Sequence, residues 1–178
     1  MDAGLHQLQG KAKGVKPSEL VAFLEECYRE RRALADRHRA VAAHVAGYDA
    51  NNPYQYVINR EDMHVEWLAD ALEALGAERP APAAGPSLTI ARGKDAWKPL
   101  VQEDVRGMQQ FIDKWRPRVE QLTHARNRTM LRLMLGEMKE QVHLFNQIAT
   151  GVADVLGRGN ESAADRRGVV GSTRWLGD

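Results

Sequence analysis

The chain has 178 residues, of which 43% are hydrophobic and 28% charged, and this is the composition of one folded domain rather than of a disordered protein. Its net charge of +1 argues against nucleic acid or an anionic membrane as an electrostatic partner. The single cysteine, Cys27, excludes an internal disulfide framework and a Cys-x-x-Cys metal site.

Residues 1–16 contain glycines and lysines without hydrophobic periodicity, and we expect them to form a flexible arm. They carry no apolar segment of the kind that directs secretion. No run of apolar residues in the chain approaches the ~18 that a membrane span needs. We therefore expect a cytoplasmic protein without membrane contact.

Two long amphipathic helices are expected in the first half of the chain. Pro17 and Glu19 favour a helix start, because proline is tolerated in the first turn and an acidic residue interacts well with the helix dipole. The pattern predicts a helix over about 17–47, a turn over 48–53 and a second helix over about 54–75. In the first helix, apolar residues recur at steps of three, four or seven: Leu20, Leu24, Cys27, Leu34, Val41 and Val45.

Residues 77–94 are rich in proline, alanine and glycine and form too long a stretch for a tight turn between helices. Fully extended, they would span on the order of 55–60 Å, which is more than the length of either helix. One interpretation is a flexible linker. The interpretation that we prefer is a crossover along the bundle, which makes the second and third helices parallel.

Two further helices are expected in the second half of the chain. The third begins near Asp95, and Pro117 should kink or interrupt it. The fourth starts either directly after Pro117 or after a turn near residues 124–128, and it ends at about Gly157. Its inward face is expected to carry Met130, Leu133, Met134, Glu137, Gln141, Leu144, Ile148, Val152 and Val155.

A repeated Glu-x-x-His spacing is the strongest chemical signal. Glu61 and His64 lie in the second expected helix, and Glu140 and His143 lie in the fourth. Positions i and i+3 of a helix share one face with Cβ atoms roughly 5–6 Å apart, so each couple can converge on one ion. Two glutamates and two histidines inside an apolar bundle are costly without a metal or mutual pairing. We therefore expect both couples to face the bundle interior and to bind metal.

Over residues 17–157 the chain resembles the ferritin-like superfamily. The resemblance rests on Glu61-Asp62-Met63-His64, on the following Trp67-Leu68 and Leu75-Gly76, and on Asp104 and Glu140-x-x-His143 further along. It implies an all-α fold, namely a ferritin-like four-helix bundle with a long crossover between helices 2 and 3. It also implies a di-iron or manganese centre with oxygen and nitrogen ligands, and a homo-oligomer such as a dimer. Ferroxidase, oxidase and peroxidase activities all occur on this fold, which does not by itself determine the function.

The resemblance further implies one glutamate ligand from the first helix and one from the third. The first-helix candidates are Glu30, near the family position, and His38, which is nearer the level of Glu61 if the two helices form a hairpin. On the third helix the expected position falls on Gln109, which is not a carboxylate, and Asp104 lies one turn away. The sequence leaves open an incomplete, a mononuclear or a lost metal site.

Each candidate ligand also has a purely structural interpretation. The glutamates fit surface ion pairs, and the histidines fit half-buried or solvated positions. A second hypothesis for the whole chain is therefore a metal-free helical bundle used for oligomerisation or protein binding. The absence of nucleic-acid binding is expected under both hypotheses, because the chain is close to neutral.

The sequence also suggests partners and a domain organisation. An oxidase would need an external electron donor, because the cysteines of a rubredoxin-type domain are missing. We expect an arm over 1–16, the four-helix domain over 17–157 and a flexible tail over 158–178. Within the tail, Gly168-Val169-Val170-Gly171-Ser172 faintly resembles the docking peptides of encapsulin cargo proteins, which implies docking to a protein shell. A tail that is flexible or docks on its own bundle is the alternative.

Overall fold

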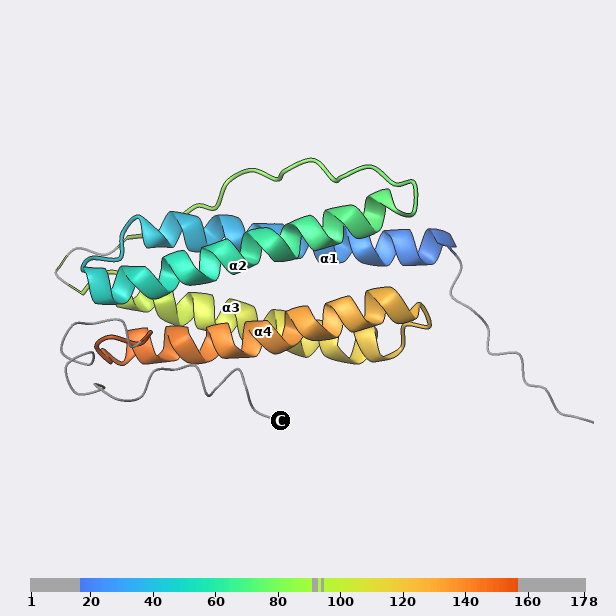
Figure 1. Cartoon of the computed structure of the whole chain (residues 1–178). Coiled ribbons are helices and arrows are strands. Elements are labelled where there is room, and N and C mark those ends of the chain that lie inside the picture. The colour runs from blue at the N-terminus through green and yellow to red at the C-terminus, as the bar shows by residue number, and fades with distance from the viewer. Residues whose placement is uncertain (1–16, 91–92, 94, 157–178) are drawn as a thin grey trace, which may run out of the picture.

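The computed structural model describes residues 17–90, 93 and 95–156. Within these residues the chain forms four α-helices and no strand (Figure 1). The expected all-α four-helix bundle is thereby confirmed. Its helices are α1 (Pro17–Ala42), α2 (Tyr48–Glu73), α3 (Lys98–Glu120) and α4 (Ala125–Ala149).

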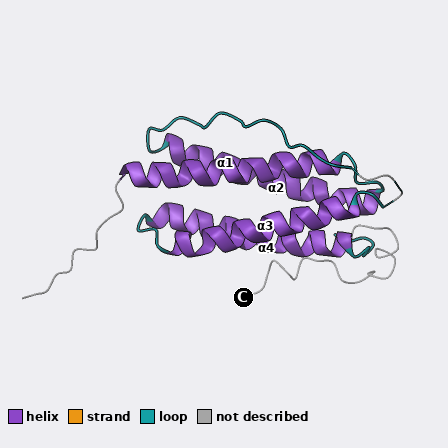
Figure 2. Cartoon of the chain, turned by 180° about the vertical axis from the view of Figure 1, so that it is seen from behind, coloured by secondary structure: helices purple, strands orange, loops and turns teal. Residues whose placement is uncertain are grey.

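The long connection between α2 and α3 determines the topology. Helices α1 and α2 form one antiparallel hairpin, and α3 and α4 form another (Figures 1 and 2). The connection runs back along the whole bundle, so α2 and α3 are parallel, as the crossover interpretation predicts. Part of it lies against α1, where Tyr28 and Arg32 line a shallow cleft together with Ala81 and Pro86.

The turn between α1 and α2 is shorter than expected, because α1 ends five residues earlier and α2 begins six residues earlier than the pattern predicts. Gly47 adopts a φ of 91°, a conformation that glycine tolerates best, directly before α2. The Asn51 side chain donates to the Ala42 carbonyl at 2.8 Å and so ties the first turn of α2 to the end of α1. The turn-forming residues therefore build the start of α2. In α3, Pro117 does not end the helix, which continues to Glu120.

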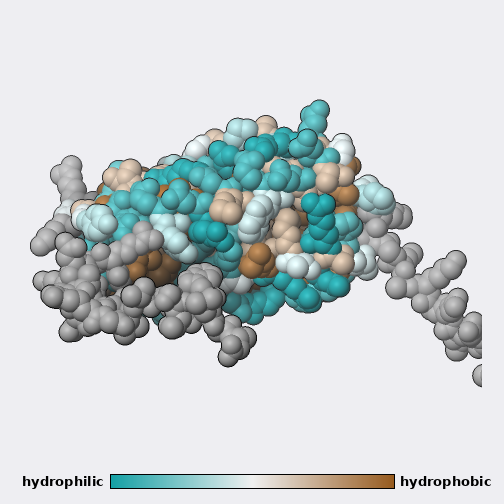
Figure 3. All heavy atoms as spheres, viewed as in Figure 1, coloured by the Kyte–Doolittle hydropathy of each residue, from teal (hydrophilic) through white to brown (hydrophobic). Residues whose placement is uncertain are grey.

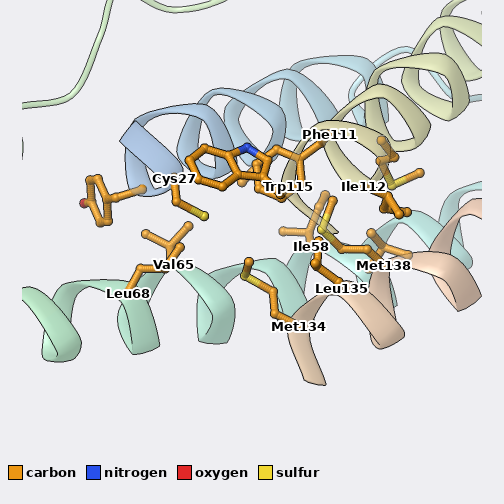
Figure 4. Close-up of a cluster of buried hydrophobic side chains, with 14 of the residues drawn as sticks. Cys27, Ile58, Val65, Leu68, Phe111, Ile112, Trp115, Met134, Leu135 and Met138 are labelled. Carbon is orange, nitrogen blue, oxygen red and sulfur yellow. The ribbon is translucent and has the colours of Figure 1, made fainter. Parts of the chain in front are cut away.

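Hydrophobic side chains from all four helices meet in one core (Figure 4). Trp115 of α3 is fully buried, and Cys27 of α1 and Val65 of α2 lie near it in the same cluster. Met108 of α3 and Met134 and Met138 of α4 are buried as core filler, whereas Met130 of α4 is only partly buried. Each fully buried side chain of this size stabilises the fold by about 1.5–3 kcal/mol.

The expected arm (1–16) and tail (158–178), including the encapsulin-like segment, lie outside the residues that the structure describes. None of the described helices combines the length and the hydrophobicity that crossing a lipid bilayer requires.

Candidate functional site

Glu61 on α2 is the centre of a charged cluster in the bundle interior, and its side chain is fully buried. The Arg31 guanidinium donates from Nη1 to Glu61 Oε1 at 2.7 Å. His38 Nδ1 lies 2.7 Å from the same carboxylate oxygen. Arg31 and His38 are seven residues apart on α1, which is close to two helical turns, so both face α2 and reach one carboxylate.

His64 lies one turn beyond Glu61 and extends the cluster to α4. Its Nδ1 is 3.2 Å from Arg31 Nη2, and its Nε2 is 2.8 Å from Glu137 Oε2. Because a guanidinium can only donate, His64 Nδ1 must accept, and the ring proton is then on Nε2 and is donated to Glu137. Arg60 also donates to Glu137, from Nε at 3.1 Å. Both ring nitrogens of His64 are thus engaged by other side chains.

These contacts set the charges at neutral pH. Burial raises the pKa of Glu61, but Arg31 and His38 together outweigh burial and lower that pKa to about 2. Burial and the charge of Arg31 lower the pKa of His64 to about 4, against the opposing effect of Glu137. Glu61 is therefore an anion paired with Arg31, and His64 is a neutral ring between Arg31 and Glu137.

A second buried carboxylate, Asp104 of α3, is engaged separately. It accepts from the Tyr54 hydroxyl and from Arg37 Nε, each at 2.7 Å. Burial raises the pKa of Asp104, and His38, Tyr54 and Arg37 offset only part of this increase. Asp104, which the sequence places near the expected third-helix ligand, therefore forms an ion pair with Arg37 and a hydrogen bond with Tyr54.

Several buried polar atoms of the cluster have no hydrogen-bond partner among the described residues: Arg31 Nε, His38 Nε2, Glu61 Oε2, and Nε2 and Oε1 of Gln141. Gln141 lies on α4 and, together with Arg60 and Glu137, lines a cavity of about 90 Å³. An unpaired buried polar group costs about 1–3 kcal/mol. Gln141, with both amide atoms unpaired, is therefore a weak point of the fold.

We expect Gln141→Leu to raise the free energy of unfolding by about 1–2 kcal/mol, because it removes an unpaired amide from the interior. Urea denaturation followed by circular dichroism measures this change. Gln110→Leu, on the exposed side of α3, is the matched control and should change stability by less than about 0.5 kcal/mol. A less stable Gln141→Leu protein would show that the amide makes a favourable interaction.

Three of the six predicted metal ligands come together in the structure, namely His38, Glu61 and His64. Glu140 and His143 do not join them, because both are exposed on the outer side of α4. The expectation that they face the interior is wrong. Burial on α4 follows another stripe, which contains Met134, Leu135, Met138, Gln141 and Phe145.

Glu30, the sixth predicted ligand, also lies away from the cluster. Its carboxylate pairs with Lys114 and accepts from Trp115 Nε1 at 2.9 Å, at the surface between α1 and α3. Glu30 therefore forms a surface ion pair, as the structural interpretation of this residue expects, and does not lie among the candidate ligands. The α4 residue that does meet His64 is Glu137, which the sequence pattern places on the inward face but which was not predicted as a ligand.

The residues present do not fit a ferritin-like di-metal centre. The group next to both Glu61 and His64 is the Arg31 guanidinium, whose fixed positive charge repels a metal cation and whose hydrogen bonds occupy Glu61 Oε1 and His64 Nδ1. Neither Glu30 nor Asp104 contributes a carboxylate to the cluster. In the described part of the chain, no group of three or more His, Cys, Asp or Glu side chains could hold a metal ion.

Comparisons with known proteins agree with the fold. No protein-family model and no curated protein matches the sequence. The crystal structure of the conserved hypothetical protein rv2844 from Mycobacterium tuberculosis is similar with a TM-score of 0.65 at 19% identity, over 75% of this chain and 99% of that chain. A mutant of Dps1 from Mycobacterium smegmatis is similar with a TM-score of 0.54 at 13% identity, over 73% of this chain and 94% of that chain. At these identities the likeness shows a ferritin-like fold and nothing about activity.

Proposed function

We propose that this chain is a ferritin-like bundle that works without a metal centre, as a protein-interaction module. The observation that carries the proposal is the position of Arg31, whose guanidinium binds the carboxylate of Glu61 and lies against His64. In this interpretation a side chain of the protein supplies the positive charge that a metal ion supplies in a di-metal bundle. The interior is then a structural element rather than a reaction centre.

An internal ion cluster has a structural role that hydrophobic side chains do not supply. Burying charges costs several kcal/mol for each ion, and the attraction between partners repays this cost only when the geometry is good. Arg31 meets Glu61 and His64 only when α1 and α2 pair in one register, so the cluster selects that register. His64 and Glu137 add the same constraint between α2 and α4.

The oxidase hypothesis loses its support from the ligand set. It needs carboxylates from α1 and α3 beside Glu61 and His64, whereas α1 supplies Arg31 and His38 there. Glu140 and His143, the second expected couple, are exposed. The external electron donor that an oxidase requires has no role in a metal-free module.

Metal binding is the direct test, since the proposal predicts that the wild-type chain binds no stoichiometric metal. In isothermal titration with Mn²⁺, with Zn²⁺, or with Fe²⁺ under anaerobic conditions, the wild type and Glu61→Ala/His64→Ala should give the same heat of binding. Arg31→Glu should instead create a site, because it places a third carboxylate beside Glu61, His64 and Glu137. We expect about one ion per chain in this variant and a melting temperature that rises with added metal.

The matched control for this experiment is Arg32→Glu, one residue further along α1. Arg32 pairs with Asp36 in a half-exposed position, so this variant has the same change of charge without reaching the cluster. It should gain no metal site. Stoichiometric metal in the wild-type chain that is lost in Glu61→Ala/His64→Ala would overturn the proposal and restore the metalloprotein hypothesis.

A further inference from the structure

The outer face of α4 carries a large hydrophobic side chain that the fold itself does not use. Leu133 is 54% exposed in the N-terminal half of this helix. Half-buried Met130 on α4 and Trp67 on α2 adjoin it along an apolar groove of about 540 Å³. Hydrophobic atoms are visible over α4 on this side of the molecule, between hydrophilic ones (Figure 3). Leu133, Met130 and Trp67 therefore line one groove rather than standing apart.

Gly136 lies one turn from Leu133 and is exposed on the same face. A Cβ atom added there would meet nothing within 4 Å. Gly107 of α3 differs, because a Cβ atom there would lie 3.3 Å from the Leu34 side chain, so packing against α1 accounts for that glycine. Glycine inside a helix costs about 1 kcal/mol relative to alanine, and nothing within the described bundle accounts for this cost at Gly136. Close approach by another helix would account for it.

Apart from Glu137, which Arg60 and His64 engage, the exposed charges on this face are placed symmetrically about Leu133. Arg126 lies seven residues before it and Glu140 seven residues after it, which is close to two helical turns in each direction, or about 10.5 Å. Both side chains are exposed, and neither forms an ion pair with another residue that the structure describes. Met130 and Gly136 are likewise three residues before and three residues after Leu133.

We propose that two copies of this chain form a dimer through the outer face of α4, with the two α4 helices antiparallel and Leu133 at the twofold axis. This symmetry brings Arg126 opposite Glu140 of the partner subunit, and it brings Glu140 opposite the partner's Arg126. It also places the Met130 side chain against Gly136 of the partner subunit, where the missing Cβ leaves room. One helix face thus supplies both halves of an isologous interface.

This inference deepens the proposed function, because it names the partner of the interaction module as a second copy of the chain. The charge pattern favours a second copy over an unrelated partner, because this face is complementary to itself. In an antiparallel pair, each Arg126 lies opposite Glu140 of the partner subunit, whereas in a parallel pair like charges would repel. The apolar centre and the two outer ion pairs match the usual anatomy of an interface, with a hydrophobic core and a polar rim.

Charge reversal tests the geometry. Sedimentation equilibrium of the full chain at about 50 μM should show twice the mass of one chain. Arg126→Glu and Glu140→Arg, made separately, should each weaken dimerisation at least tenfold, because each places like charges opposite one another twice. The double variant restores opposite charges and should return the dissociation constant to within about threefold of the wild type. Arg106→Glu, exposed on α3, is the matched control and should leave the dimer unchanged.

Gly136→Leu separates loss of the interface from loss of the fold. The added side chain meets open space in one copy and improves helix propensity, so the melting temperature of the monomer should stay the same or rise. The same side chain blocks the approach of the second helix and should abolish the dimer. A monomeric wild type, or single charge reversals that the double variant does not rescue, would overturn the proposed dimer.

The outcome is independent of the metal titration above. If the wild-type chain binds stoichiometric metal and the charge-reversal series still behaves as expected, the metal-free function fails and the dimer stands. If no metal binds and the chain is monomeric, the interface fails and the metal-free bundle stands.

Discussion

Replacing Arg31 with methionine should lower the free energy of unfolding by about 3–5 kcal/mol. The substitution keeps most of the side-chain volume but leaves the fully buried carboxylate of Glu61 without its guanidinium partner, and it removes the donor to His64. The carboxylate then keeps only its contact with His38, and a buried charge that loses its ionic partner is strongly destabilising. Because small domains are stable by only about 5–15 kcal/mol, much of the stability should be lost.

Urea denaturation of Arg31→Met, Glu61→Leu and the double variant measures this effect as a double-mutant cycle. The double variant removes both charges and should recover most of the loss, since replacing a whole buried ion pair with apolar groups is often close to neutral. Arg132→Met is the matched control, because Arg132 pairs with Glu120 at the surface, where both side chains are about half exposed. It should cost less than about 1 kcal/mol. Equal losses for Arg31→Met and Arg132→Met would show that the buried cluster does not stabilise the bundle.

The position of Arg31 shows why the sequence predicts part of this site and misses the rest. Arg31 stands in the run Arg29-Glu30-Arg31-Arg32, and arginine is almost never fully buried unless it is paired, so composition favours a solvated residue. Its spacing from Cys27 and Ala35, four residues on each side, nevertheless places it on the inward stripe of α1. At this position the helical periodicity correctly predicts burial, whereas the charge of the side chain wrongly predicts exposure.

The two Glu-x-x-His couples illustrate a second limit. The spacing puts both members of a couple on one face of a helix, but it does not determine whether that face points inward. On α2 the apolar neighbours of Glu61 and His64 settle the direction, and both are buried. On α4 the buried stripe passes through Met138 and Gln141 instead, so the second couple is exposed. The crossover and the four helices were predictable because they depend on long patterns that single residues do not change.

Acidification from pH 7 to pH 4 should destabilise the bundle by about 3 kcal/mol through His64 alone. Burial and the charge of Arg31 lower the pKa of His64 from 6.5 to about 4, although Glu137 and Glu61 oppose the shift. Between these two values the unfolded chain binds a proton at His64 and the folded chain does not. Stability therefore falls as the pH falls through this window, because proton binding favours the state with the higher pKa.

A further loss should follow at lower pH through Glu61. The pKa of this carboxyl is lowered from 4.5 to about 2, since Arg31 and His38 together outweigh the effect of burial. A carboxylate with a lowered pKa stabilises the fold at pH values above 4.5, and this contribution disappears as the pH falls toward 2. The two groups act in adjacent pH windows, so acid denaturation of the wild type should begin well above the pH at which ordinary carboxylates are protonated.

Urea denaturation at half-unit steps from pH 7.5 to pH 4 measures the slope of stability against pH, and His64→Gln should flatten that slope. Glutamine can still accept from Arg31 and donate to Glu137 but takes up no proton. His143→Gln replaces an exposed histidine of α4 and should leave the slope as in the wild type. If His64→Gln keeps the full acid sensitivity above pH 4, then His64 is protonated in the folded chain, and the neutral ring between Arg31 and Glu137 would have to be abandoned.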